Sequence, residues 1–146
     1  MITHKKVHSH FGIYGYFKKD NAILLIKKAR GPYKGMFDLP GGSPTENELN
    51  ESTLRREIEE ETGLGIISYK KFPEEEITTL FYTYTVNNEN YLLKHSALLY
   101  VIDDYEGNLK FSPDGEDSYG AEWIDLSSIH KNNATPFVQF CIANAE

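Results

Sequence analysis

The sequence has little of what marks several classes of protein. It contains a single cysteine, Cys141, so no disulfide can form within the chain, which fits a reducing compartment. No apolar run reaches the roughly 18 residues that a membrane-spanning helix needs, and no signal-peptide pattern opens the chain. We therefore expect a cytoplasmic protein that has no membrane partner.

Basic residues are also scarce. The chain carries 15 Lys and Arg against 22 Asp and Glu, a formal net charge of -7, which disfavours nucleic-acid binding through a broad basic face. Much of the excess is local, because residues 48–61 hold six glutamates and two arginines. Such a concentration of one charge requires a counter-charge nearby.

The arrangement of apolar runs predicts an α/β (α+β) fold. The 146 residues, 40% of them apolar, have ordinary globular composition, and we expect one domain over residues 1–146. Residues 11–17 and 22–26 read as a hairpin, residues 50–62 as a helix with Asn50 as N-cap and Gly63 at its end, residues 65–72, 76–86, 91–103 and 121–126 as strands, and residues 136–145 as a second helix. Residues 31–44 and 103–120 read as loops, the first with a short strand at 36–39. This order predicts an α/β/α sandwich with a mixed β-sheet between helices.

The glutamates of the first helix are not spread evenly around it. At about 100° per residue, Glu57, Glu60 and Glu61 fall on one arc beside the apolar stripe of Leu54 and Ile58. The opposite side holds Ser52, Arg55 and Glu59. We therefore expect the three clustered carboxylates to be partly desolvated.

Desolvated carboxylates at close range cannot all remain ionised without a cation. Mg²⁺ is the natural partner, and Mn²⁺ accepts the same oxygen ligands. Zinc is disfavoured because no His or Cys lies near this helix, and the EF-hand spacing for Ca²⁺ is absent. A solvated acidic face is the plain alternative to a metal site.

A longer pattern surrounds these glutamates. From Gly42 to Leu64 the sequence reads G-x5-E-x7-R-E-I-x-E-E-x-G-L, with all nine specified positions present. This pattern resembles the Nudix box, and the chain is similar to MutT-like Nudix hydrolases. The "LPGG" of residues 39–42 and the "EW" of residues 122–123 resemble family features outside the box. The resemblance implies a Nudix-type sandwich. Asn47 departs from the commonest family pattern, because many members have Gly there, but Asn tolerates the left-handed backbone.

The resemblance also implies roles for single residues. The implied metal ligands are Glu57, Glu60 and Glu61, with Glu48 as a further ligand or an outer-shell carboxylate and Gly42 offering its carbonyl. Arg56 would orient Glu57 or Glu60 through charge-assisted hydrogen bonds. The general base would be Glu57, Glu60 or a downstream acid, for which Asp117 is the candidate, with Glu116 beside it.

The reaction implied is Mg²⁺-dependent hydrolysis of the diphosphate linkage in a nucleoside diphosphate joined to another group. Nucleoside triphosphates, nucleotide sugars and dinucleoside polyphosphates remain open as substrates, and Arg30, Lys34 and Glu116 are candidate substrate contacts. A non-catalytic nucleotide-sensing module on the same fold is the alternative, which the complete box disfavours.

Two markers of particular branches are missing. Ala134 stands where MutT-type enzymes carry a purine-reading Asn, and Pro73 follows the box too closely for the ADP-ribose branch. Neither branch is therefore supported by its marker, and the sequence leaves monomer and homodimer open.

Overall fold

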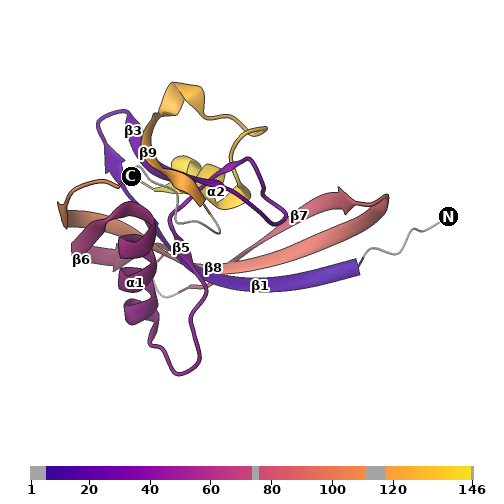
Figure 1. The fold of residues 1–146 in the computed structure, drawn as a ribbon, viewed down its shortest axis with the longest axis horizontal. Helices are drawn as coiled ribbons and strands as arrows, with labels where there is room; N and C mark the ends of the chain where they lie inside the picture. The colour runs from indigo at the N-terminus through magenta and orange to yellow at the C-terminus, as the bar shows by residue number, and fades with distance from the viewer. Residues whose placement is uncertain (1–5, 74–75, 111–117, 146) are drawn as a thin grey trace.

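The computed structural model describes residues 6–73, 76–110 and 118–145. Within them the chain forms two β-sheets and two α-helices (Figure 1). The strands are β1 (Lys6–Tyr16), β2 (Lys18–Lys19), β3 (Ala22–Lys28), β4 (Phe37–Asp38), β5 (Gly41–Gly42), β6 (Leu64–Lys71), β7 (Thr78–Val86), β8 (Glu89–Gly107) and β9 (Ser118–Asp125). The helices are α1 (Asn50–Thr62) and α2 (Pro136–Asn144), with a 3₁₀ turn at Leu126–Ser128. No helix of this part of the chain is long and apolar enough to cross a membrane.

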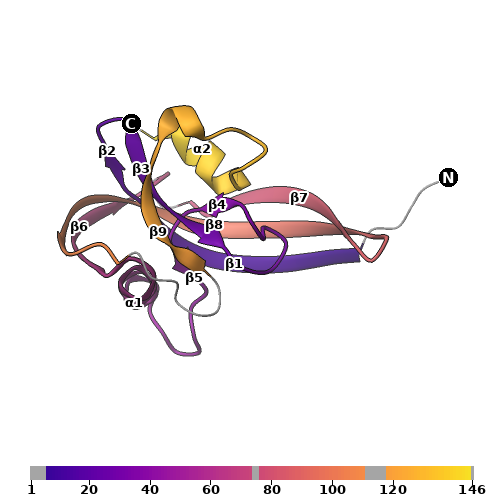
Figure 2. The same ribbon diagram turned by 45° about the horizontal axis from the view of Figure 1, so that its top comes forward.

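The larger sheet is mixed and is organised by β1 and β8. These strands run parallel over the whole of β1, from Lys6 opposite Tyr91 to Tyr16 opposite Val101. The first half of β8 pairs antiparallel with β7 and the second half with β6, while β5 pairs with the other edge of β1. The first half of β1 therefore continues with β7 and β8 as a ribbon beyond the helices (Figure 2).

The smaller sheet holds β2, β3, β4 and β9. A hairpin turn occurs at Asp20 and Asn21, as predicted, with Asp20 in the left-handed region at φ 55°. The predicted partner of β3 is wrong, however, because residues 11–16 pair with β8 in the other sheet and only residues 18–19 pair with β3. β3 also pairs antiparallel with β4 and with β9.

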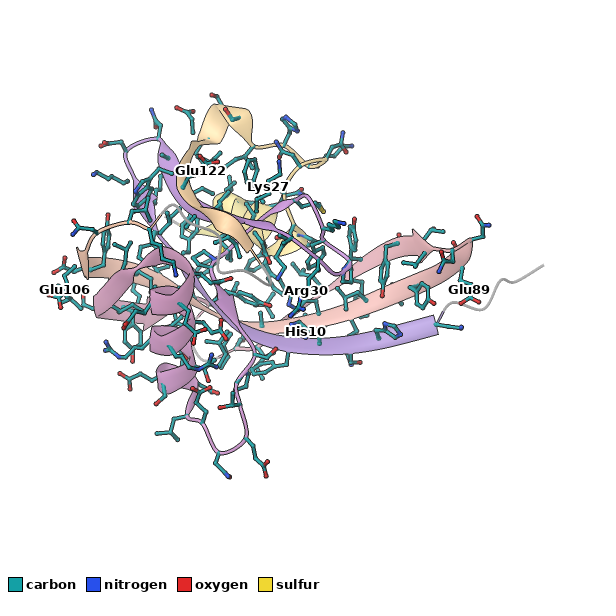
Figure 3. All side chains as sticks on the ribbon, viewed as in Figure 1. His10, Lys27, Arg30, Glu89, Glu106 and Glu122 are labelled. Carbon is teal, nitrogen blue, oxygen red and sulfur yellow. The ribbon has the colours of Figure 1, made fainter. Side chains whose placement is uncertain are left out.

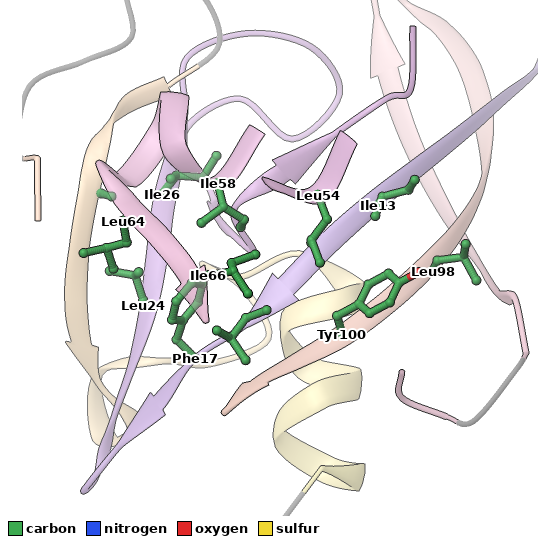
Figure 4. Packing of buried hydrophobic residues seen from close by; sticks show 12 residues of the cluster. Ile13, Phe17, Leu24, Ile26, Leu54, Ile58, Leu64, Ile66, Leu98 and Tyr100 are labelled. Carbon is green, nitrogen blue, oxygen red and sulfur yellow. The ribbon is translucent and has the colours of Figure 1, made fainter. Parts of the chain in front are cut away.

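Alternate residues of the strands face opposite helices. Leu24 and Ile26 of β3 join the cluster that contains Leu54 and Ile58 of α1 (Figure 4), whereas Ile23 and Leu25 join the cluster that contains Phe137 of α2. Because side chains alternate across a strand, β1, β3 and β8 each contribute to both cores. The predicted α/β/α sandwich with a mixed sheet between helices is confirmed.

Several boundaries differ from the prediction, among them the start of β9, which begins at Ser118 rather than at residue 121. Leu49, rather than Asn50, occupies the N-cap position of α1, without a side-chain capping bond. Residues 103–107, read as loop, extend β8, because they continue to pair with β6 up to Leu64 opposite Gly107. The predicted end of α1 is correct, since Gly63 adopts φ 80° and its N–H donates to the carbonyl of Glu59 at 2.9 Å.

Gly63 should tolerate no side chain. A Cβ there would lie 2.7 Å from the carbonyl oxygen of Asn108 and the backbone is left-handed, so Gly63→Ala adds steric conflict to backbone strain. Gly35→Ala is the matched control, because Gly35 has φ 84° but nothing within 4 Å of the added carbon. We expect a loss of about 1–2 kcal/mol for Gly35→Ala and at least about 1 kcal/mol more for Gly63→Ala, measured by urea unfolding. Equal losses would show that the contact with Asn108 has no energetic weight.

Candidate functional site

The site lies where α1 passes the short strand β5. Ile13 and Tyr14 of β1 pair with Gly42 and Gly41, which fixes the glycine turn against the sheet. A Cβ built on Gly42 would lie 2.5 Å from Cδ of Glu57 and less than 3 Å from both of its carboxylate oxygens. The Glu57 carboxylate therefore rests on the bare backbone of Gly42, and only glycine leaves room for it.

Glu61 lies deeper in the same place. Its residue is 4% exposed, and the N–H of Gly41 donates to its Oε1 at 2.7 Å. Burial, with a further contribution from the charge of Glu57, raises the pKa of Glu61 well above its usual range. A buried acid in this position stays ionised only if a cation comes close, and Lys28 is one charge that already acts in that direction.

Arg56 links the remaining acids of the site. Its guanidinium donates to both oxygens of Glu48, at 2.8 and 3.0 Å, and to Oε1 of Glu57 at 2.8 Å. Glu48 also accepts a hydrogen bond from Thr53 Oγ1 at 2.6 Å, and these contacts, led by that with Arg56, hold the pKa of Glu48 well below its usual range. Glu48 thus fixes the guanidinium, which in turn orients Glu57.

Glu60 differs from the expectation of partial desolvation. Its side chain is 57% exposed, and its nearest ionic partner is Arg56 at 3.6 Å. Glu60 occupies the outer rim of the acidic arc, whereas Glu57 and Glu61 turn toward β5. Of the three acids expected to be partly desolvated, Glu61 is therefore buried, Glu57 is half-buried and Glu60 is exposed at the rim.

The remaining candidates divide three ways. Arg30 lines a pocket next to the carboxylates, and Lys34 is exposed and is not among the described residues that line it. Asp117 and Glu116 lie outside the described residues. Asn47 has φ 68°, so its predicted left-handed backbone is confirmed.

The donor set suits a hard divalent cation. Glu57 and Glu61 bring carboxylate oxygens to the Gly41–Gly42 turn, and Mg²⁺ uses one or two carboxylates together with water and substrate phosphate. In the described part of the chain no group of three or more His, Cys, Asp or Glu side chains is placed so that it could hold a metal ion. A pair of carboxylates is nevertheless compatible with Mg²⁺, because Mg²⁺ takes its other ligands from water and substrate phosphate, whereas structural zinc and calcium sites need more protein ligands.

A pocket of about 320 Å³ lies beside Tyr14, the residue of β1 that pairs with Gly41. It is lined by His8, Ser9, His10, Tyr14, Lys28, Arg30, Gly31, Pro32, Tyr33, Asp38, Tyr84, Leu93 and His95. Arg30 and His10, labelled in Figure 3, both line this pocket. Tyr14 connects the pocket to the carboxylates, because it pairs with Gly41 and its side chain borders the pocket.

A neutral histidine organises the pocket wall. His95 is 2% exposed, and its Nε2 and Nδ1 lie 2.8 and 3.0 Å from the hydroxyls of Tyr14 and Tyr33. Burial lowers the pKa of His95 to about 3, so the ring stays neutral, with one nitrogen donating and the other accepting. The sequence contains only a weak indication of this role, since His95 is a single histidine within an apolar strand.

Asp38 is the acid of this pocket. Its Oδ1 accepts hydrogen bonds from Leu39 N at 2.9 Å and Thr135 Oγ1 at 2.7 Å, and the residue is 4% exposed. Burial raises the pKa of Asp38 to about 6. The sequence analysis missed Asp38 and Lys28, although Asp38 directly precedes "LPGG" and Lys28 alternates with Arg30 along one chain segment.

Helices on both sides of a mixed sheet, with a buried acidic centre and a pocket that contains Lys28 and Arg30, are typical of an enzyme that hydrolyses phosphate compounds. The chain belongs to the Nudix family, since the NUDIX domain model matches residues 6–140. It is a Nudix pyrophosphohydrolase, which acts on diphosphate linkages. Members of the family typically use a divalent metal.

Known relatives agree with this assignment. The chain is 34% identical over 125 residues to an ADP-ribose pyrophosphatase of Methanocaldococcus jannaschii, covering 86% of this chain and 67% of that protein. It is 28% identical over 92 residues to an 8-oxo-dGTP diphosphatase of Proteus vulgaris, covering 58% and 81%. Both are enzymes by name, so the comparisons favour catalysis over a sensing module.

Solved structures show the same fold. A MutT NUDIX hydrolase from Burkholderia pseudomallei superposes with a TM-score of 0.72 at 24% identity, covering 95% of this chain and 99% of that chain. A bifunctional NMN adenylyltransferase/ADP ribose pyrophosphatase from Francisella tularensis, complexed with AMP and a Mn ion, gives a TM-score of 0.58 at 14% identity, covering 95% and 42%.

The charge of Asp38 should destabilise the protein progressively between about pH 4 and pH 6, and fully above about pH 6. Below about pH 3 the carboxyl is largely protonated in folded and unfolded chains alike; as the pH rises, the unfolded chain releases its proton first, so the free energy of unfolding falls. Asp38→Asn retains the oxygen that accepts from Thr135 and Leu39 but carries no charge. Relative to wild type we expect little change at about pH 3 and a gain of up to roughly 3 kcal/mol at about pH 7.5, measured by urea unfolding. A difference that is independent of pH would contradict this.

Proposed function

We propose that the protein hydrolyses the diphosphate linkage of a small nucleoside diphosphate derivative with Mg²⁺, for which Mn²⁺ can substitute. The observation that carries the proposal is the packing of the Glu57 carboxylate on the backbone of Gly42, with Glu61 buried behind it. That arrangement sets two carboxylates at one turn of the backbone.

The metal would be held by Glu57, Glu61, the rim acid Glu60 and the carbonyl of Gly42. When bound, it would neutralise phosphate charge and lower the pKa of the attacking water. Arg56 keeps the carboxylate of Glu57 directed at the glycine turn, and Glu48 keeps Arg56 in place through two hydrogen bonds. Removing Glu48 would therefore act on the centre through Arg56 rather than through a ligand.

The proton of the attacking water requires a base. Glu60 is suited to this role, because it is exposed at the rim and so reaches solvent and substrate together. Glu57 and Asp117 are the other acids proposed for it. Lys28 and Arg30 line the adjoining pocket and would attract the phosphates that lie on either side of the attacked bond.

The substrate is a nucleoside diphosphate joined to another group, and the pocket determines which group is bound. Its polar lining, including Asp38 and the hydroxyls of Tyr14 and Tyr33, can hydrogen-bond a base or a ribose. ADP-ribose and 8-oxo-dGTP belong on the substrate panel, because they are the compounds for which two relatives are named. Nucleoside triphosphates, nucleotide sugars and dinucleoside polyphosphates complete it.

Glu57→Gln should abolish most of the activity. The substitution keeps the size of the side chain but removes the charge that faces Gly42, so we expect hydrolysis to fall by about 100-fold or more. Glu59→Gln is the matched control, since it removes the same charge from the exposed side of the same helix and should leave the rate near wild type. Product release is measured over the substrate panel with Mg²⁺, and the products are separated to identify the attacked phosphorus. Similar rates for the two variants would exclude Glu57 from the centre.

Metal binding should be visible without substrate. Mg²⁺ or Mn²⁺ bound only by the folded chain raises its stability, by about 2.7 kcal/mol at a concentration 100 times the Kd. Gly42→Ala should remove this gain, because its methyl group would occupy the place of the Glu57 carboxylate. Thermal unfolding is followed with and without millimolar metal, and far-UV circular dichroism checks that the variant folds. A wild type that shows no shift, or a Gly42→Ala variant that shifts equally, would refute the proposed metal site.

A further inference from the structure

Strand β7 has one partner in the larger sheet and one open edge. Its residues pair with β8 without a register shift, from Thr78 opposite Ala97 to Val86 opposite Glu89. In residues 6–73, 76–110 and 118–145, no other strand pairs with β7, and no backbone hydrogen bond joins its second edge to a loop or a helix. The distal half of β7 lies in the ribbon that extends beyond the helices (Figures 1 and 2). The N–H and C=O groups along this edge can therefore pair with another chain.

The sequence of β7 has none of the features that keep an edge strand single. Natural proteins protect such edges with charged side chains, Pro, a bulge or a very short strand. Residues 78–86 read TTLFYTYTV and contain no charged residue, no His, no Pro and no Gly. All of them except Leu80 are β-branched or aromatic, the types that are enriched in strands. This edge is therefore long, uncharged and suited to pairing.

The other open edges among the described strands carry the protection that β7 lacks. β6 lies along the same side of β8 as β7, but it has two register shifts and ends in Lys70 and Lys71. β2, β4 and β5 are each two residues long. β9 contains Glu122 and Asp125, and β1 begins with Lys6. The unprotected edge of β7 is thus an exception within its own fold, which indicates that a partner covers it.

The outer face of the ribbon exposes apolar side chains beside this edge. Phe81 is 59% exposed and stands opposite Lys94 of β8. Two residues further along β7, Thr83 stands opposite Leu92. Leu92 in turn stands opposite Val7 of β1, which is 58% exposed. Because residues that oppose each other in a sheet share a face, a strand added to the edge of β7 would cover the ring of Phe81 as well as the backbone.

A second copy of β7 is complementary to this edge. Two identical strands can pair antiparallel across a two-fold axis, so that the same edge meets itself. In the register that pairs all of residues 78–86, Tyr82 lies on the axis and Phe81 faces Thr83 of the partner subunit. Leu80 likewise faces Tyr84 of the partner subunit. Aromatic residues that face β-branched or apolar residues stabilise antiparallel pairs, and no like charges meet because β7 carries none.

We propose that two copies of the chain form a homodimer through antiparallel pairing of their β7 strands, which joins the two larger sheets into one. The order across the axis is then β1, β8 and β7 of one protomer, followed by β7, β8 and β1 of its partner. Tyr84 lines the pocket beside Tyr14, so the added strand supports one wall of that pocket. This inference concerns assembly and holds whichever nucleotide is hydrolysed.

The test introduces a charge into the unprotected edge strand. Thr83→Lys changes an exposed position of β7, and the two added charges of a dimer repel each other near the axis. We expect wild type to have twice the mass of one chain at micromolar concentration, and Thr83→Lys to raise the dissociation constant of the dimer at least about 10-fold, measured by sedimentation equilibrium. Ser68→Lys is the matched control, because it adds the same charge at an exposed position of β6 and should leave the dimer unchanged. Far-UV circular dichroism checks that both variants fold.

A double variant tests the register, and hydrogen exchange locates the interface. Phe81→Glu combined with Thr83→Lys places opposite charges at positions that face each other across the axis. The double variant should therefore dimerise more tightly than Thr83→Lys alone. Backbone amides of residues 78–86 that point to the open edge should exchange more slowly in wild type than in Thr83→Lys, whereas exchange in residues 64–71 should be the same in both.

Several results would overturn the proposed dimer. A wild type that sediments as a monomer, or as an assembly larger than a dimer, has no such two-fold pairing. A dimer that Thr83→Lys and Ser68→Lys affect equally, or whose β7 amides exchange as fast as those of Thr83→Lys, is joined through another surface. A double variant that dimerises no more tightly than Thr83→Lys overturns the antiparallel register. These measurements need no substrate, so a failure here leaves the proposed hydrolysis to be decided by the substrate panel.

Discussion

The site depends on one steric constraint: the carboxylate of Glu57 and the backbone of Gly42 occupy space that leaves no room for a Cβ. This close approach requires that β5 be fixed on the edge of β1 and that α1 be fixed above the sheet. Leu54 and Ile58, both fully buried, supply the second condition by anchoring the side of the helix next to the acidic arc. The apolar stripe of α1 therefore sets the position of the acids through core packing rather than through any contact with them.

The electrostatic arrangement follows from the same geometry. Crowded acids on one helix repel each other, and the chain offsets part of this repulsion with Arg56, which contacts Glu48, Glu57 and Glu60. These contacts do not include Glu61, which keeps a raised pKa. The repulsion that remains is concentrated at the Gly41–Gly42 turn. A buried carboxylate without a nearby cation lowers the stability of the fold. A divalent cation bound there would therefore reduce the repulsion between the acids as well as assist the reaction.

The sequence could predict what depends on neighbours along the chain. The helix period set the acidic arc, and local preferences predicted the left-handed backbone of Asn47 and Gly63. It could not predict features that depend on distant segments. The parallel pairing of β1 with β8 replaced the expected hairpin partner, and the Tyr14–His95 contact joins residues 81 positions apart. The exposure of Glu60 was also missed, because a helical wheel gives direction but not the depth of the surface that the helix faces.

The two parts of the site are built by different elements, and this separates chemistry from selectivity. The reacting centre uses α1 and β5, whose sequence matches the family pattern throughout. The pocket uses residues 8–14 of β1, the first half of β8 and the segment from Lys28 to Asp38, which that pattern does not cover. Tyr14 belongs to both parts, because it pairs with Gly41 and lines the pocket. Substitutions along the ribbon can therefore change which group is bound without moving Glu57 or Glu61. The family pattern of residues 42–64 can therefore identify the reaction without identifying the substrate.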